Sequence, residues 1–374
     1  MDSPFSYSRG ELPADWNKRR LGSLLQFRNG QDVPGTDNES KSYPVYGSGG
    51  EFKRTNKYLF DGTSILFGRK GTIDKPLLVN GRFWTVDTMY FTVPRPDVDP
   101  RFVYYWALDA PLSILSTNTA VPSMTSSDLA QLYLAVPPLD TQCAIADYLD
   151  RETAEIDGMR ADLDEMERLL EERRRNIVKS VFSKLRESGC NYQKLGYVAQ
   201  FRNGQDTKGV EDMSGDHPVY GSGGVFKRAN SFLFDGPSVL FGRKGTLDKP
   251  LLVDGKFWTV DTMYYTVLSR DILPSFLHKW ATTIPFEKYS TDTALPSMTS
   301  TVLSQLRIPV PPLTKQRRIA DEIDRETAEI DSMLADIKEL RDLLTERRAA
   351  VISAAVTGQI DIPASPTNKD ETHA

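Results

Sequence analysis

The chain has 374 residues, of which 39% are hydrophobic and 10% aromatic, and its formal net charge is −5. This length allows two or three domains with hydrophobic cores, and no run of about 18 apolar residues is present that would span a membrane. The negative charge argues against a protein that wraps nucleic acid by bulk positive charge. The N-terminus lacks a signal-peptide core, and Cys143 and Cys190 have no counterparts elsewhere, so we expect a reducing cytoplasm and no disulfide or metal framework.

The first 140 residues predict a mixed α/β domain with a mainly antiparallel or mixed sheet. A helix is expected over 100–109, where Pro100 stands early and aromatic residues line one side. A second short helix follows Thr125, with Ser126 or Ser127 as its N-cap. Apolar runs separated by Gly-containing turns predict the strands. These runs are 64–67, 76–79, 83–86, 89–93 and 132–136.

A long helix is predicted next, over residues 141–187, and a second one over 315–358. Their apolar positions recur in steps of four and three, which defines a heptad seam. About 45 residues of helix reach roughly 65 Å. Neither apolar stripe is stable when exposed to water, so we expect the two helices to pair as an antiparallel coiled coil. The predicted seam is Ile145, Leu149, Ile156, Met159, Leu163, Met166, Leu170 and Ile177, then Ile319, Ile323, Ile330, Met333, Ile337, Leu340, Leu344 and Val351, interrupted by Glu152, Arg173, Glu326 and Arg347.

The chain is an internal duplication with a constant offset of 174 residues. Residues 43–93 and 217–267 are identical at 40 of 51 positions, and no insertion or deletion separates the copies. A period this long indicates a duplicated domain, because solenoid repeats run about 20–50 residues. The predicted organisation is a first globular domain (1–140), a first helix (141–187), a second globular domain (188–314), a second helix (315–358) and a disordered tail (359–374).

Catalytic motifs are missing from the sequence. The three histidines are His217, His278 and His373, and none has a counterpart in the other copy. No cluster of His, Cys and acidic residues has metal-ligand spacing, and the glycine-rich segments lack the Walker and dinucleotide-binding patterns. A self-sufficient nuclease or methyltransferase is therefore disfavoured, and the pattern favours a binding protein.

Three glycine-containing loops in each copy combine exposed backbone with donor side chains. Arg, Asn and Gln read guanine and adenine edges in the major groove, and Lys, Arg, Ser and Thr bind phosphate oxygens. Each loop alone also fits an ordinary turn with solvated charges. The candidate DNA-binding residues are Arg28, Asn29, Gln31, Tyr46, Ser48, Lys53, Arg54, Arg69, Lys70, Thr72, Lys75, Ser123 and Thr125, with Arg202, Asn203, Gln205, Tyr220, Ser222, Lys227, Arg228, Arg243, Lys244, Thr246, Lys249, Ser297 and Thr299 in the second copy.

An antiparallel helix pair would relate the two globular domains by an approximate two-fold axis. Duplex DNA relates its strands in the same way. Two near-identical readers on a rigid spacer would then recognise an interrupted palindrome, as symmetric dimers recognise two half-sites.

The repeated order of domain, Pro-Pro-Leu corner, Gln, Ile-Ala and long helix resembles the specificity (S) subunit of type I restriction–modification enzymes. The matching stretches are 123–129, 136–142 and 145–146, then 296–300, 310–316 and 319–320, with Leu12-Pro13 and Trp16 as the opening. The resemblance implies two target-recognition domains that each read half of a bipartite DNA site. It also implies helices that dock two DNA adenine methyltransferase (M) subunits, and no catalysis in this chain. S-adenosylmethionine would belong to M, and ATP and Mg to the partner subunits, including the restriction (R) subunits.

The sequence departs from the family pattern in two ways. Thr141 and Lys315 stand where Glu is frequent, and the two domains are nearly the same where family members carry dissimilar ones. We therefore expect a near-symmetric target, with differences arising from 33–42 and 207–216, where the copies diverge most. The alternative is a stand-alone coiled-coil scaffold or adaptor that binds protein or glycan.

Overall fold

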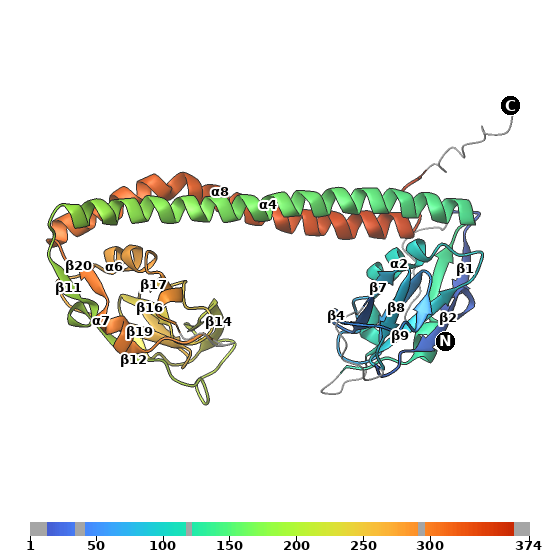
Figure 1. Cartoon of the computed structure of the whole chain (residues 1–374), viewed down its shortest axis with the longest axis horizontal. Helices are drawn as coiled ribbons and strands as arrows, with labels where there is room; N and C mark the ends of the chain where they lie inside the picture. The colour runs from blue at the N-terminus through green and yellow to red at the C-terminus, as the bar shows by residue number, and fades with distance from the viewer. Residues whose placement is uncertain (1–12, 34–41, 117–121, 291–295, 363–374) are drawn as a thin grey trace, which may run out of the picture. The chain divides into compact units, whose positions relative to one another are not determined.

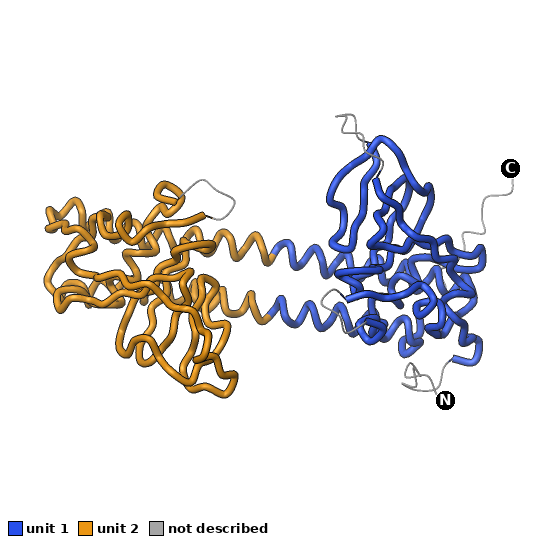
Figure 2. The backbone as a smooth tube through the Cα atoms, turned by 90° about the horizontal axis from the view of Figure 1, so that it is seen from below, with its two compact units in different colours: residues 1–162, 340–374 blue, residues 163–339 orange. Residues whose placement is uncertain are grey.

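The structure is a computed structural model that describes residues 13–33, 42–116, 122–290 and 296–362. Leu12, most of the divergent segment 33–42, and residues 363–374 of the predicted disordered tail (359–374) lie outside this range. In the described start of that tail, Ile360 and Ile362 pack against the core of the first domain. The chain forms two compact units (Figure 2): Met1–Asp162 with Leu340–Ala374, and Leu163–Glu339. Each unit combines one globular domain with a segment of both long helices.

The first globular domain contains three small sheets, as expected for a mixed α/β domain. Strands β1 and β10 pair antiparallel, and the order β2-β9-β6-β7 is antiparallel throughout. The order β4-β3-β8-β5 is mixed, because β3 runs parallel to β8. The strands are β1 (Asn17–Arg20), β2 (Leu25–Asn29), β3 (Tyr43–Gly47), β4 (Gly50–Thr55), β5 (Phe60–Asp61), β6 (Ser64–Gly68), β7 (Leu77–Val79), β8 (Arg82–Thr85), β9 (Met89–Pro94) and β10 (Tyr133–Val136).

The second globular domain repeats this topology strand for strand. Its sheets have the orders β11-β20, β12-β19-β16-β17 and β14-β13-β18-β15, again with one parallel pair, β13 and β18. The strands are β11 (Tyr192–Lys194), β12 (Ala199–Asn203), β13 (His217–Gly221), β14 (Gly224–Ala229), β15 (Phe234–Asp235), β16 (Ser238–Gly242), β17 (Leu251–Val253), β18 (Lys256–Thr259), β19 (Met263–Leu268) and β20 (Arg307–Pro309).

Short helices cover the sheets, and Figure 1 shows α2 between the first long helix and the strands of its domain. The predicted strands and the helix over 100–109 are confirmed, with strand ends shifted by one residue. The predicted N-cap is wrong: Thr125 caps α3, because it is the last extended residue and its side chain accepts a hydrogen bond from Asp128 N at 3.1 Å. The helices are α1 (Leu21–Leu24), α2 (Pro100–Asp109), η1 (Leu112–Leu115) and α3 (Ser126–Gln131), repeated as α5 (Leu195–Val198), α6 (Pro274–Ala281), η2 (Phe286–Lys288) and α7 (Ser300–Gln305).

The long helices are α4 (Leu139–Glu187) and α8 (Leu313–Val356). In the first unit, the start of α4 and the end of α8 contribute to one core, where Ile145 and Leu149 lie with Ile352 and Ala355. In the second unit, the end of α4 and the start of α8 contribute in the same way to the other core. Within each unit one helix therefore leaves the globular domain while the other returns, so the paired segments are antiparallel (Figure 1).

The predicted heptad seam is wrong in part. Met166, Met333 and Leu340 are 51%, 41% and 48% exposed, whereas Thr153 and Thr327 are buried. An α-helix has 3.6 residues per turn, so a strict 3.5-residue pattern drifts around its surface by about 20° per heptad. Buried residues are instead separated by eleven positions in places, as between Ile145 and Ile156 and between Ile319 and Ile330. Of the predicted interruptions, Glu152 and Arg347 meet across the pair at 3.4 Å.

Candidate nucleic-acid interface

The predicted DNA-binding segments converge on the turn between β8 and β9, residues 85–89. Gly30 N donates to Met89 O at 3.0 Å and Gln31 N donates to Thr85 O at 2.9 Å. A Cβ atom at Gly30 would lie 2.0 Å from the carbonyl oxygen of Val86, so only glycine allows this approach. The end of β2 is thereby fixed beside the turn.

Two further segments bind the same turn through their backbone. The carbonyl of Tyr46 accepts hydrogen bonds from Val86 N and Thr85 Oγ1, both at 3.1 Å. Arg69 N donates to Thr88 O at 2.8 Å, and Arg69 Nη1 donates to Asp87 O at 3.3 Å. The turn therefore holds the Arg69 guanidinium in place on the surface of the domain.

Lys70 and Ser123 form an isolated β-bridge that brings the segment before α3 to the same place. Ser48, at the tip of the β3–β4 hairpin, lies beside Gly71, where a Cβ atom would be 3.0 Å from Ser48 Oγ. We name the resulting set the turn cluster. It consists of Gln31, Tyr46, Ser48, Arg69, Lys70 and Ser123 in the first domain, and Gln205, Tyr220, Ser222, Arg243, Lys244 and Ser297 in the second, where the corresponding bonds recur.

The remaining candidates lie outside the turn cluster. Arg28 and Asn29 end strand β2, so they are not in a loop as the sequence predicts. Lys53 and Arg54, which follow the predicted loop, lie within strand β4. The reason is pairing: β2 pairs with β9, and β4 pairs with β3. Arg202 and Asn203 in β12, and Lys227 and Arg228 in β14, repeat this placement.

Several of these side chains already have partners in the domain. Arg28 Nη2 donates to Gln26 Oε1 at 3.2 Å, and Lys227 pairs with Glu211 at 2.8 Å. Thr125 and Thr299 cap α3 and α7. Thr72 and Thr246 are half-buried beside the loop, and Lys75 and Lys249 are exposed. The turn cluster is therefore the part of the predicted set that the fold brings together.

The sequence analysis missed an exposed phenylalanine in the β3–β4 hairpin and its counterpart in the β13–β14 hairpin. The register of the β3–β4 hairpin shifts after Val45, so Phe52 is the extra residue of a β-bulge and is 58% exposed. Phe226 occupies the same position in β14 and is 53% exposed. Lys53 Nζ lies 5.9 Å from the Phe52 ring centroid, and the second domain repeats this contact. From the sequence, an aromatic residue that is the same in both copies suggests a core position. The bulge in the structure shows that Phe52 and Phe226 are instead on the surface.

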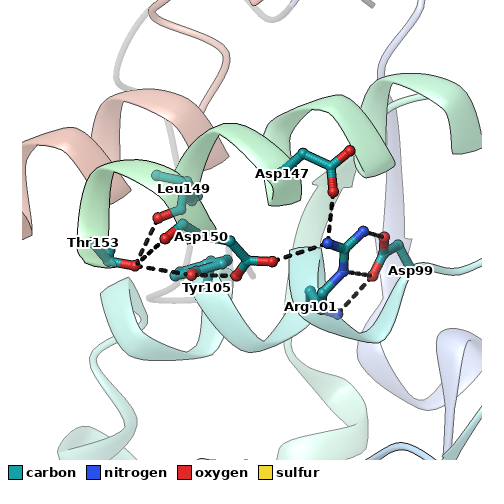
Figure 3. A network of polar contacts seen from close by, with 7 residues as sticks. All are labelled: Asp99, Arg101, Tyr105, Asp147, Leu149, Asp150 and Thr153. Carbon is teal, nitrogen blue, oxygen red and sulfur yellow. Dashed lines mark hydrogen bonds and ion pairs between the residues drawn. The ribbon is translucent and has the colours of Figure 1, made fainter. Parts of the chain in front are cut away.

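A polar network joins the first domain to α4 (Figure 3). Arg101 on α2 pairs with Asp99, with Asp147 at 2.6 Å and with Asp150 at 2.9 Å. Hydrogen bonding to Asp99 and to the two helix carboxylates raises the pKa of Arg101 above its ordinary value. Burial, and next the hydrogen bond to Asp150, raises the pKa of Tyr105. This network fixes the orientation of the domain on the helix.

The second domain has a simpler contact at the equivalent place, an ion pair between Lys279 and Asp324. Within the ranges that the structure describes, no three His, Cys, Asp or Glu residues are grouped to hold a metal ion. In those same ranges, no helix is both long and apolar enough to cross a membrane.

Comparison with known proteins identifies the family. Residues 13–168 and 187–341 both match the family described as "Type I restriction modification DNA specificity domain". The chain belongs to this family. It is 20% identical over 417 residues to the type I restriction enzyme EcoDI specificity subunit of Escherichia coli, covering 97% of this chain and 93% of that protein. It is 23% identical over 156 residues to the EcoprrI specificity subunit of E. coli, covering 40% of this chain and 38% of that protein.

The fold of this specificity subunit is also that of a solved structure. That structure is described under "complex assembly and conformational transition of the type I R-M system". It matches this chain with a TM-score of 0.56 and 16% identity, and the match covers 94% of this chain and all of the solved chain. The two family matches, one for each copy, together with the repeated domains and the long helices, make the chain a non-catalytic specificity subunit of a type I restriction–modification system.

Proposed function

We propose that each globular domain of this specificity subunit reads one half of a bipartite DNA target through its turn cluster and the adjacent hairpin. The observation that carries the proposal is the repetition of the turn cluster with the same hydrogen bonds in both domains. Arg69 and Lys70, with Arg243 and Lys244, supply the positive charge that phosphate contacts require. Gln31 and Gln205 supply amides suited to adenine edges.

The make-up of the two units supports a near-palindromic, interrupted target. Each unit holds one globular domain, the first part of the helix that follows it and the last part of the other helix. Two such equivalent units suit two inverted half-sites, and the length of the paired helices would set the gap between those half-sites.

The same proposal assigns partners to the chain. The long helices dock two adenine methyltransferase (M) subunits, and restriction (R) subunits complete the complex in the cytoplasm. S-adenosylmethionine, ATP and Mg belong to those partners, and this chain contributes no cofactor of its own. Because the net charge is −5, strong DNA affinity is expected only in the complex.

The turn cluster is tested by the double variant Arg69→Ala with Arg243→Ala. Removing both guanidinium groups should lower the DNA affinity of the assembled complex by about tenfold or more, and should reduce the slope of affinity against salt by about 2, one for each lost phosphate contact. Helix content and melting temperature should stay at the wild-type values. Binding is measured by fluorescence anisotropy across a salt series.

The matched control is Arg82→Ala with Lys256→Ala, which removes the same charge from the other end of β8 and β18. This control should bind DNA as the wild type does. If the Arg69/Arg243 variant assembles and methylates normally, the turn cluster is not the DNA contact. A salt-independent affinity for a protein or glycan ligand would instead favour the scaffold alternative.

The form of the target is tested by sequencing methylated bases in a host that carries the chain with its partner methyltransferase, and in the same host without the chain. We expect a methylated motif made of two inverted half-sites separated by an unspecified gap. A motif whose halves share no inverted relation would contradict the proposal.

A further inference from the structure

Within 43–93 and its repeat 217–267 the two copies differ at few positions, and only one of these differences lies next to the turn of the candidate DNA-contacting hairpin. Between 43–93 and 217–267, eleven positions differ, and the pair Glu51 and Val225 is the one on the paired strand beside the hairpin turn. The others lie in the core, in the turns, or at the far ends of β3 and β8. Those ten pairs are Tyr43/His217, Thr55/Ala229, Lys57/Ser231, Tyr58/Phe232, Thr63/Pro237, Ile65/Val239, Ile73/Leu247, Asn80/Asp254, Arg82/Lys256 and Phe91/Tyr265.

Glu51 and Val225 occupy equivalent and accessible places. Glu51 is paired with Tyr46 across the hairpin, and Val225 is paired with Tyr220. The Glu51 side chain is 41% exposed, and Val225 is 54% exposed. Each stands directly before the bulged phenylalanine, so the same backbone presents two different chemical groups to the solvent.

The surroundings keep that chemical difference at the surface. The Glu51 carboxylate lies 3.2 Å from Arg54 Nη1, and burial followed by the negative charge of Glu51 raises the pKa of Tyr46. Arg54 Nη2 also donates to Ser42 O at 2.8 Å, and the equivalent Arg228 Nη2 donates to Asp216 O at 3.2 Å. Arg228 has no carboxylate at position 225 to pair with, and its Nε donates to Gly215 O at 2.7 Å. Val225 and Phe226 then form an apolar tip, where the first domain presents a hydrogen-bond acceptor.

These two groups prefer different bases. The major groove admits a two-stranded β-ribbon; there a carboxylate accepts a hydrogen bond from cytosine N4, whereas an apolar side chain contacts the thymine methyl group. We propose that Glu51 and Val225 are specificity-determining residues, and that the first domain selects C·G where the second selects T·A at the equivalent base pair. The two half-sites therefore differ at this pair. The inference rests on the proposed function.

The test uses the complex of the full chain with its methyltransferase and determines the methylated motif of each variant. Glu51→Val should change the preferred pair from C·G to T·A in one half-site, with a shift in preference of about tenfold, and so make the half-sites alike at that pair. The reciprocal variant Val225→Glu should change the other half-site from T·A to C·G. Both side chains are exposed, and an unchanged melting temperature confirms that each variant folds.

Two further variants separate base reading from charge. Asn80→Asp also converts a first-domain residue to its second-domain counterpart, but in the turn between β7 and β8, and should leave the motif unchanged. Glu51→Gln removes the charge but keeps the polar group, and should not create a T·A preference. An unchanged motif in Glu51→Val, or an equal rise in affinity for all DNA in both Glu51 variants, would overturn the inference while the proposed function stands. A wild-type complex without a bipartite motif would instead remove the proposed function itself.

Discussion

Gln142 and Gln316 show what the repeated Pro-Pro-Leu-x-x-Gln motif does. Each is the fourth residue of its long helix and is almost fully buried. Gln142 Oε1 accepts from Asp99 N at 2.9 Å, while Nε2 donates to Pro137 O at 3.0 Å. Gln316 makes the corresponding bonds to Leu273 N and Pro311 O, both at 2.8 Å. A single amide therefore ties the start of the long helix to the loop before α2 or α6.

Gln142→Ala is expected to destabilise the first unit by roughly 1–3 kcal/mol, because it leaves buried backbone groups without partners. Gln142→Glu should be more harmful at pH 7, since a buried carboxylate would face the carbonyl oxygen of Pro137. Burial raises the pKa of such a carboxyl above its unfolded value, so the variant should regain stability as the pH falls and the group is protonated. Thermal melting at pH 5 and pH 7 measures both effects.

The matched control for this prediction is Gln316→Ala. Hydrogen exchange should accelerate at the amide of Leu273 in this variant and at the amide of Asp99 in Gln142→Ala. If the backbone amide of Asp99 exchanges equally fast in Gln142→Ala and in the wild type, the side-chain amide of Gln142 does not hold the start of α4 to the loop before α2.

The candidate site was partly predictable from single residues. Arg69 and Lys70 follow a strand and stand in a glycine turn in both copies, which is enough to predict an exposed cationic loop. Phe52 was not predictable, because its exposure depends on a bulge set by pairing between β3 and β4. The convergence of Gln31, Tyr46 and Arg69 was also hidden, since their common partner is the backbone of another turn. Local patterns give residue types, but long-range backbone bonds decide which of them meet.

At the scale of elements, α2 and α6 differ at several titratable positions, and at one of them Tyr104 in the first copy corresponds to His278 in the second. His278 is half-buried, and its Nε2 lies 3.1 Å from Pro250 O. Burial lowers the pKa of His278, and the nearby charges of Lys279 and Arg174 lower it further, while the Pro250 bond and Asp324 oppose them. The folded second unit therefore favours the neutral imidazole.

His278 on α6 should make the stability of the second unit sensitive to acid. Because the folded pKa of His278 lies below its unfolded value of about 6.5, the unfolded chain binds more protons, and stability is lost as the pH falls below that value. His278→Tyr, which installs the first-copy residue, should reduce the difference in melting temperature between pH 7.5 and pH 5.5. The control Tyr104→Phe should leave that difference unchanged. A His278→Tyr chain with the wild-type pH response would show that another group titrates.

The long helices show how far an element can be predicted. Their existence and their pairing follow from the apolar spacing. So do the buried seam residues Ile145, Leu149, Ile156, Ile319, Ile323, Ile330 and Ile337. The predicted buried face is wrong at Met166 and Leu340, which are exposed. A heptad pattern describes a supercoil, whereas buried residues of these helices recur in eleven-residue steps. Arg174 and Arg348 show the same shift: they are half-buried beside Asp331, at 2.7 Å, and Asp157, at 3.6 Å, where the heptad pattern predicts Arg173 and Arg347.

At the scale of the whole molecule, the duplication gives both units the same parts. Each contains a globular domain, part of the helix that leaves it and part of the helix that returns to it. The sequence alone predicts this organisation, because the 174-residue offset never changes. What the sequence does not predict is the asymmetry of the anchoring: Arg101 and its carboxylates hold the first domain, whereas Lys279 and Asp324 hold the second.

If the helices act as the spacer, inserting helix should lengthen the gap in the target by a calculable amount. Each added residue contributes about 1.5 Å, and each base pair about 3.4 Å. Twenty-two residues inserted at the matched positions Asp164 and Lys338 add about 33 Å, or roughly ten base pairs. Twenty-two residues complete about six helical turns, and ten base pairs complete about one turn of DNA. Each globular domain should therefore still face its half-site. The methylated motif should keep its half-sites and gain roughly ten base pairs of gap.

An eleven-residue insertion at the same two positions is the sharper control. It preserves the buried face of the helices, so the chain should fold, but it adds only about half a turn of DNA and directs one half-site away from its reader. Methylation should therefore be lost with eleven residues and return with twenty-two. If the gap in the motif is the same in the wild type and in the twenty-two-residue variant, the helices do not measure the distance between half-sites, and the spacing must be set by the partner subunits.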